Sequence, residues 1–304
     1  MTARYVAPTT IEEALAILAR DKAARPIAGG TDLVVASRQG RKPLPESIVA
    51  IHRIAELGQH AVSDGSLVLG ALTSHAWLAG SAEVRRDWTA LADAAAIVGS
   101  PATRGTGTIG GNLMNASPAA ETTAPLVVLG ANVMLRAIGR GSRIVPVANL
   151  AVGPGRTSAA PDELLTTVIV PTPPPASGSA YMRLEYRRAM EIAIVGAAAL
   201  VTLAADGSIA SARIALTAVG PTIVQAPDAE AILAGGAADS ATFRAAGAAA
   251  AAAARPIDDV RAGADYRRAM LAVVVTRTIA AAVARARGEG IPIPASRWAH
   301  GQEA

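Results

Sequence analysis

Apolar residues follow two different spacings in the N-terminal part of the chain. A capping box at Thr10 and Glu13 precedes apolar residues at helical spacing, which predicts a helix as far as Arg20. Short apolar runs predict strands over residues 25–28 and 48–51, with a second helix between them. The opening unit is therefore predicted to run strand, loop, helix, strand.

A second pattern begins near Ser63, where strands are separated by polar turns. Helices are expected after Ser74 and over 88–98, and strands over 67–72, 133–135, 144–147 and 164–170. The stretch 99–118 is rich in Gly, Ser, Thr, Asn and Pro and is predicted to be a loop. Because long ordered loops are usually functional, this stretch is a candidate site.

Four prolines between residues 171 and 178 mark a predicted domain boundary of extended character. Beyond it we expect strands over 179–188, 192–205 and 209–219, followed by alanine-rich helices over 226–233, 241–254 and 265–287. Alternation in the first of these strands places Met182, Leu184 and Tyr186 toward the C-terminal core. The residues expected on the opposite face are Tyr181, Arg183, Glu185 and Arg187.

Composition narrows the possible classes of function. Apolar residues make up 51% of the 304 residues, which indicates a globular chain large enough for two or three domains. The absence of cysteine excludes disulfides, a cysteine nucleophile and an iron–sulfur cluster held by this chain. The net charge is +4, but the arginines are scattered and aromatic residues are few, so no nucleic-acid binding is expected.

The N-terminus has no apolar signal core, and the most apolar run, residues 192–205, is shorter than the roughly 20 residues that a membrane-spanning helix needs. We therefore expect a cytoplasmic protein without a membrane span.

A first candidate binding segment joins a predicted strand directly to a predicted helix. Glycine lets a backbone approach a ligand closely, and free N–H groups at a helix start can bind an anion. A plain strand-to-helix turn is the alternative interpretation. The segment comprises Pro26, Ile27, Ala28, Gly29, Gly30, Thr31, Asp32 and Leu33.

A second candidate segment lies in the predicted loop and carries no charge between Arg104 and Glu121. Its backbone N–H groups could form a nest around phosphate oxygens. The match of residues 105–110 to the pattern G-x-G-x-x-G does not indicate a Rossmann fold, since no strand precedes it and no acidic residue lies about 20 positions later. The segment comprises Gly107, Thr108, Ile109, Gly110, Gly111 and Asn112.

Other candidate chemistry is sparse. The four histidines have no metal-ligand spacing, so no metal residue is predicted, and no catalytic acid or base is assigned. His75 follows Ser74 at a predicted helix start. It could face a cofactor, or it could be a structural histidine.

These segments resemble a known family. Residues 28–33 and 108–112, the latter followed by Ala116-Ser-Pro118, are similar to the two FAD loops in the medium subunits of the xanthine dehydrogenase and carbon monoxide dehydrogenase family. Residues 162–171, 181–195 and 264–268 continue the resemblance in order. It implies an α+β fold with FAD-binding subdomains over 1–57 and 58–175, of the PCMH/VAO-like type. A smaller α/β C-terminal domain over 176–304, with a three-stranded antiparallel sheet and helices, is implied to follow.

The resemblance also implies a cofactor site. Both glycine segments would line the pyrophosphate and ribityl chain of FAD, with Ser117 and Glu121 toward the adenosine. Leu164 or Leu165 would touch the ring system, and Arg183 would lie near it. Glu121, Arg183 and Glu191 stand where Asp, Lys and Asp are common, and each keeps the charge sign. An ordinary ion pair with Glu185 or another carboxylate is the alternative for Arg183.

The implied function is electron relay through FAD. An iron–sulfur small subunit and a molybdopterin large subunit would be the partners, and NAD, oxygen or a quinone the acceptor. Two alternatives remain at this point. One is a stand-alone FAD-dependent oxidase or dehydrogenase with its own small substrate, and the other is a nucleotide-binding assembly module without turnover.

Overall fold

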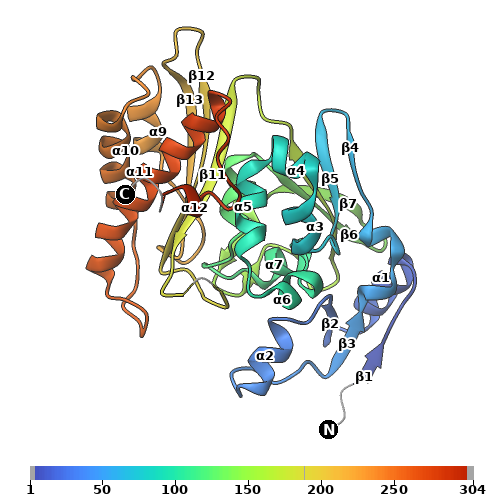
Figure 1. Cartoon of the computed structure of the whole chain (residues 1–304). Coiled ribbons are helices and arrows are strands. Elements are labelled where there is room, and N and C mark those ends of the chain that lie inside the picture. Colours follow the sequence, from blue (N-terminus) through green and yellow to red (C-terminus); the bar gives the residue numbers. More distant parts are fainter. Residues whose placement is uncertain (1–3, 188, 300–304) are drawn as a thin grey trace. The chain divides into compact units, whose positions relative to one another are not determined.

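The computed structural model describes residues 4–187 and 189–299, which fall into two compact units (Figure 1). Unit 1 comprises Met1–Trp77, Pro101–Ala116 and Gly130–Pro171, and unit 2 comprises Leu78–Ser100, Ser117–Leu129 and Thr172–Ala304. The units are therefore not consecutive in sequence, because two stretches that precede the proline-rich boundary fold with the C-terminal part. The division at 57 and 175 stays a prediction.

The first sheet of unit 1 is parallel and has the order β1-β3-β2. Helix α1 (Ile11–Arg20) covers it, and its face of Ile11, Leu15 and Leu18 is buried. The Thr10 side chain caps this helix as predicted, while Glu13 accepts a hydrogen bond from the Thr9 N–H. The strands and the short helices that follow are β1 (Arg4–Val6), β2 (Ala24–Ile27), β3 (Ser47–Ala50), η1 (Ile51–Arg53) and η2 (Ala55–Gly58).

The second sheet of unit 1 is antiparallel and has the order β4-β5-β10-β6-β7. Its strands are β4 (His60–Ser63), β5 (Ser66–Gly70), β6 (Asn132–Ala137), β7 (Gly141–Pro146) and β10 (Leu164–Pro171). The turn η3 (Val147–Asn149) follows β7, and β8 (Ala151–Gly153) and β9 (Arg156–Thr157) form a separate two-stranded antiparallel sheet. The predicted strands near 133, 144 and 164 are confirmed.

The prediction of a continuous loop over 99–118 is wrong. The stretch contains two short helices, α6 (Pro101–Thr106) and α7 (Ile109–Asn115). The Thr108 side chain accepts a hydrogen bond from the Gly111 N–H, which caps α7, and Ala116 ends the helix in the left-handed conformation. These local hydrogen bonds outweigh the low helix propensity of glycine.

Unit 2 is built on an antiparallel sheet of order β11-β12-β13-β14. The three predicted strands are present and a short fourth strand extends the sheet. Helices α9, α10 and α11 cover one face, and α5 and α8 contact the other (Figure 1). The elements are α4 (Ala82–Asp87), α5 (Thr89–Ile97), α8 (Thr123–Val128), β11 (Ser177–Leu184), β12 (Val195–Leu203), β13 (Ile209–Thr217), β14 (Val224–Gln225), α9 (Pro227–Leu233), α10 (Ser240–Ala253), α11 (Ala264–Ala286) and α12 (Ser296–Ala299).

The alternation predicted for β11 is confirmed within the strand. Met182 and Leu184 pack into the core beneath the C-terminal helices. Tyr181 and Arg183 point the other way, and both are buried. Tyr186 lies beyond the end of the strand and is exposed, so its assignment to the core is wrong. Arg188 lies outside the described residues.

Among the described helices, α11 is the one long and apolar enough to cross a membrane by length and composition. It is longer than the apolar run at 192–205 on which the expectation of no membrane span relied. Half of its apolar stretch is buried, and Leu271, Val275 and Ile279 belong to the core of unit 2. Its apolar character therefore has a packing explanation.

A buried ion pair joins α5 to the C-terminal part of unit 2. The Asp93 carboxylate accepts two hydrogen bonds from Arg285, at 2.6 and 2.9 Å, and one each from the backbone N–H groups of Tyr181 and Ala295. Asp93 is fully buried. Four donors on one buried carboxylate compensate its lost hydration.

We predict that Arg285→Met lowers the free energy of unfolding by about 3–5 kcal/mol, since it leaves a buried charge without its partner. Urea unfolding would measure the loss. Arg268→Met, which removes an exposed pair with Asp265, is the control and should change little. Equal effects of the two changes would contradict the assignment.

Candidate cofactor-binding site

The two glycine segments, far apart in sequence, pack against each other in unit 1. A Cβ at Gly29 would lie 1.9 Å from the Thr106 carbonyl oxygen, so the backbones touch at this point. A Cβ at Gly107 would lie 3.5 Å from the Thr31 hydroxyl, and one at Gly111 would lie 3.9 Å from the Ala28 methyl group. The structure thus brings together the two segments that the sequence singles out.

The first segment (28–33) follows β2 and leads into α2 (Leu33–Arg38). Pro26 and Ile27 end the strand, and Gly30 takes a positive φ of 68°. Within the described part of the chain, the backbone N–H groups of residues 29–32 have no hydrogen-bond acceptor. Four consecutive free amides at the start of a helix suit an anionic ligand.

The second segment (107–112) uses its backbone N–H groups differently. Those of Ile109 and Gly110 donate to the carbonyls of Thr73 and Ala71, and those of Gly111 and Asn112 donate to the Thr108 side chain and carbonyl. The predicted nest of free amides in this segment is therefore wrong for 109–112. These residues serve as a support on which the first segment rests.

A third segment, residues 71–75, lies along the second and was not predicted as part of the site. Besides the two bonds to Thr73 and Ala71, the His75 N–H donates to the Gly107 carbonyl at 3.1 Å. A Cβ at Gly110 would lie 2.7 Å from the Ala71 carbonyl oxygen. In this segment the sequence indicated only a helix cap at Ser74. The structure confirms the cap, since the Ser74 hydroxyl accepts a hydrogen bond from the Trp77 N–H.

His75 is buried beneath the second segment at the start of α3 (His75–Gly80). Its ring carbon Cδ2 would lie 3.3 Å from a Cβ at Gly107. Among the described residues, its Nδ1 atom and the Thr73 hydroxyl have no hydrogen-bond partner. Burial, assisted by the positive charge of Arg104, lowers the pKa of His75 from 6.5 to about 4, so the ring is neutral at pH 7.

The other predicted site residues belong to other elements of the chain. Leu164 belongs to the core beneath α1, and Leu165 is equally buried, so protein already covers both side chains. Their contact with a ring stays a prediction. Ser117, Glu121 and Arg183 all belong to unit 2, where the Ser117 hydroxyl accepts a bond from the Ala119 N–H.

Glu121 and Arg183 are in direct contact, with 2.5 Å between Oε1 and a guanidinium nitrogen. Arg183 also pairs with Glu185. The alternative interpretation of Arg183, an ion pair with Glu185 or another carboxylate, is therefore confirmed. The placements relative to FAD, with Glu121 toward the adenosine and Arg183 beside the ring, stay predictions.

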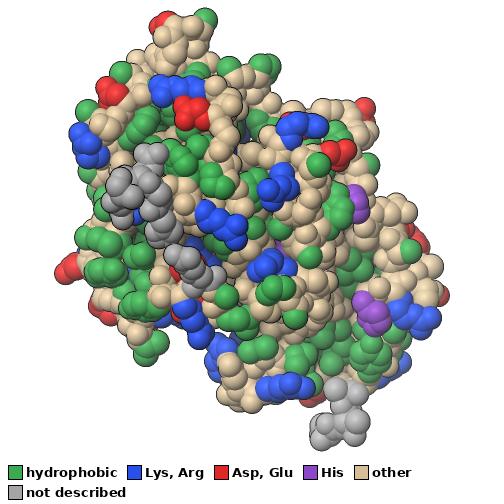
Figure 2. Space-filling view, in the orientation of Figure 1, with side chains coloured by type: hydrophobic (Ala, Val, Ile, Leu, Met, Phe, Trp, Pro, Cys, Tyr) green, Lys and Arg blue, Asp and Glu red, His purple; other side chains and the backbone are tan. Residues whose placement is uncertain are grey.

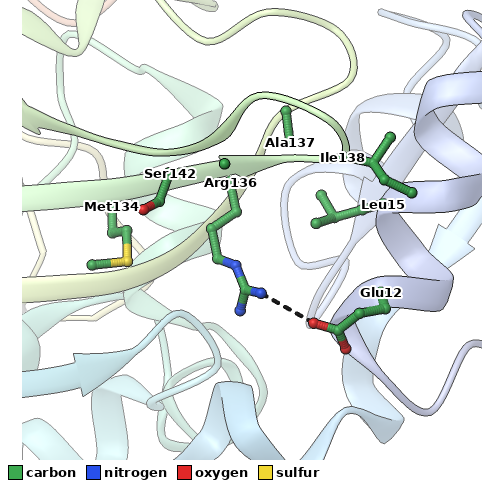
Figure 3. Close-up of a pocket in the computed structure, with 8 residues that line it drawn as sticks. Glu12, Leu15, Met134, Arg136, Ala137, Ile138 and Ser142 are labelled. Carbon is green, nitrogen blue, oxygen red and sulfur yellow. Dashed lines mark hydrogen bonds and ion pairs between the residues drawn. The ribbon is translucent and has the colours of Figure 1, made fainter.

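A separate cavity of about 450 Å³ lies between α1 and the β6–β7 hairpin (Figure 3). Arg136 and Glu12 form an ion pair at its edge. None of its lining residues belongs to either glycine segment. Figure 2 shows Lys and Arg side chains spread over the visible face, with Asp and Glu among them, as the scattered arginines of the sequence predict.

Known families match nearly the whole chain. The family described as the FAD binding domain in molybdopterin dehydrogenase matches residues 1–173. The family described as the CO dehydrogenase flavoprotein C-terminal domain matches residues 179–282. The change from one to the other falls at the proline-rich boundary.

Curated relatives and solved structures agree with these matches. The chain is 37% identical to the 6-hydroxypseudooxynicotine dehydrogenase complex subunit alpha of Paenarthrobacter nicotinovorans, over 93% of this chain and 95% of the relative. It is 33% identical to the carbon monoxide dehydrogenase medium chain of Afipia carboxidovorans, over 93% and 97%. A structure of carbon monoxide dehydrogenase from Hydrogenophaga pseudoflava superimposes with a TM-score of 0.89 at 32% identity, covering 94% of this chain and 98% of that one.

The contact between the glycine segments predicts a contrast between two alanine variants. Gly29→Ala should destabilise unit 1 by about 1–3 kcal/mol, because a Cβ cannot fit beside the Thr106 carbonyl. Gly105→Ala adds the same methyl group to the neighbouring helix where it meets nothing, and should be neutral or stabilising. Thermal unfolding of both variants measures the contrast, and similar melting temperatures would refute the contact.

The buried His75 predicts a pH dependence. The unfolded chain binds a proton near pH 6.5, whereas the native ring binds one only near pH 4. The unfolded state therefore holds more protons between these values, so the free energy of unfolding should fall by about 2 kcal/mol from pH 7 to pH 5 through this residue. Urea unfolding of His75→Leu should show a weaker pH dependence, while the exposed control His52→Leu should behave as the wild type. Identical slopes for His75→Leu and the wild type would contradict this.

Proposed function

This chain belongs to the family of FAD-binding subunits of molybdenum hydroxylase complexes, and from that premise we propose how it holds and uses the cofactor. The pyrophosphate of FAD would bind to the free N–H groups of residues 29–32 in the first segment. The second segment would fix the position of the first. The observation that carries the proposal is the row of four amides without acceptors in the described chain, which lies against a glycine-rich support.

The residues of this site fit a pyrophosphate chemically. Amide donors bind phosphate oxygens without the need for a cation. Gly29 allows the close approach to Thr106 and Gly30 takes a positive φ, so both glycines set the shape of the segment that carries these donors. The Thr31 hydroxyl, beside Gly107, could add a further donor. Bound FAD supplies the redox chemistry, and the chain supplies orientation and a set of fixed dipoles.

The chain would hold FAD without a covalent bond. It has no cysteine, and His75 lies buried beneath the second segment. A flavin attached through either side chain is therefore not expected.

We further propose that the chain relays electrons between partner subunits and an external acceptor. A molybdopterin large subunit would oxidise the substrate, and an iron–sulfur small subunit would pass the electrons to FAD. Lack of cysteine supports this division, because clusters of this kind need thiolate ligands that only another polypeptide could provide. The acceptor would be NAD, oxygen or a quinone, in the cytoplasm.

A stand-alone FAD oxidase or dehydrogenase is the second candidate. Co-purification from the native host separates the two proposals. Subunits that carry molybdenum and iron–sulfur clusters should accompany this chain if it is a relay. A chain that purifies alone and reduces its flavin with a small substrate would contradict the relay.

The binding proposal predicts the behaviour of two aspartate variants. The wild type should release one FAD per chain on denaturation. Gly111→Asp should weaken FAD binding at least about a hundredfold, since it places a carboxylate beside the proposed pyrophosphate position. Its Cβ would lie 3.0 Å from the Thr108 hydroxyl, a close contact with a side chain and not with the backbone. Gly105→Asp adds the same charge on the exposed side and is the matched control. Gly110→Asp is a poorer test, because its Cβ would strike the Ala71 backbone and disturb the fold.

Fluorescence titration with FAD would measure the affinities. FMN or no flavin in the wild type would overturn the cofactor proposal. Equal affinities of Gly111→Asp and Gly105→Asp would overturn the placement of the pyrophosphate.

A further inference from the structure

The second glycine segment is flanked on both sides by parts of unit 2. Residues 101–116 belong to unit 1, whereas 78–100 and 117–129 fold with unit 2. Each flank carries a buried carboxylate, Asp93 in the first and Glu121 in the second. The two carboxylates therefore lie close in sequence to the two ends of the stretch that contains the second segment.

Both carboxylates bind the same residue of β11. The Tyr181 backbone N–H donates to Asp93 Oδ2 at 3.0 Å, and the Tyr181 hydroxyl donates to Glu121 Oε2 at 2.5 Å. Tyr181 is fully buried on the face of the sheet that contacts α5 and α8. Glu121 raises the pKa of the already buried phenol further, so the hydroxyl keeps its proton and remains the donor.

The surroundings of Tyr181 are shaped for this role. Gly196 on the neighbouring strand β12 leaves the space that the hydroxyl occupies, since a Cβ there would lie 2.7 Å from the oxygen. Each carboxylate also has a cation, Arg285 for Asp93 and Arg183 for Glu121. Each of the two carboxylates that bind Tyr181 is therefore also part of an ion pair.

Further hydrogen bonds between α5 and β11 hold the first flank, residues 78–100, against the sheet. The Thr89 hydroxyl donates to the Ser179 carbonyl at 2.5 Å, and the Ala90 N–H donates to the Ser179 hydroxyl at 3.1 Å. The second flank is tied by the Ala218 N–H, which donates to the Pro118 carbonyl at 2.9 Å. Tyr181 contacts both flanks, through Asp93 and Glu121.

We propose that Tyr181 is a positioning residue for cofactor binding, which fixes both flanks of residues 101–116 through Asp93 and Glu121. Fixed ends reduce the number of conformations open to the second segment. Less conformational entropy is therefore lost when a ligand binds. The inference rests on the proposed function in taking FAD as that ligand. The claim that Tyr181 fixes the two flanks concerns the protein without ligand and does not depend on FAD.

Tyr181→Phe tests the proposal, with Tyr186→Phe as the matched control. Tyr186 is exposed, and its hydroxyl donates to the Arg261 carbonyl away from both flanks. In protein freed of flavin, Tyr181→Phe should speed hydrogen exchange of the amides of residues 107–113 about tenfold. It should also weaken FAD binding about tenfold, with an unchanged absorbance spectrum at saturation. Tyr186→Phe should change neither.

Gly196→Ala gives a second route to the same result, because it displaces the hydroxyl without removing it. It should reproduce both effects in a milder form, and it keeps the test open if Tyr181→Phe does not fold. Unchanged exchange at 107–113 in a folded variant would overturn the proposal. Faster exchange spread evenly over β12 and β13 would also overturn it, since Tyr181 would then only stabilise unit 2. A wild type that binds no FAD would refute the proposed function and leave the exchange test standing.

Discussion

The site depends on the backbone contact between Gly29 and Thr106. A side chain at position 29 would overlap the Thr106 carbonyl, so glycine alone permits the approach. This contact places the turn after β2 against the end of α6, although the two are distant in sequence. Without it, the first segment would lack its closest backbone contact with this part of the chain, and its free amides would have no fixed direction.

In the proposed site the two segments have different roles. Amides of residues 109–112 are satisfied by the protein, chiefly by residues 71–73 and by Thr108, which makes the second segment rigid. Amides of residues 29–32 have no acceptor in the described chain, although a backbone donor normally finds one. A rigid support under a row of free donors is an arrangement suited to a phosphate ester. The glycines of the second segment have a packing role, since a Cβ at Gly110 would strike the Ala71 backbone.

Local patterns predicted the elements well where local interactions decide the structure. The capped helix at Thr10 and the alternation of Met182 and Leu184 in β11 follow from spacing alone. The glycine-rich stretch was misjudged, because the cap at Thr108 makes a helix of residues whose composition indicates a loop.

Long-range contacts were beyond the reach of sequence patterns. The contact of Glu121 with Arg183 joins residues that no spacing relates, and both had been placed from resemblance at different parts of the cofactor. Asp93 gave no sequence signal, since a single acid in an alanine-rich helix usually faces solvent. Its burial depends on Arg285, far along the chain. Buried ion pairs between residues far apart in the chain are therefore the feature that the sequence patterns did not predict.

Amide hydrogen exchange with and without FAD tests the different roles of the two segments most directly. On addition of FAD, the amides of residues 29–32 should gain strong protection, whereas those of residues 109–112 should already exchange slowly in the free protein. Binding of FAD that leaves exchange at 29–32 unchanged would contradict the account.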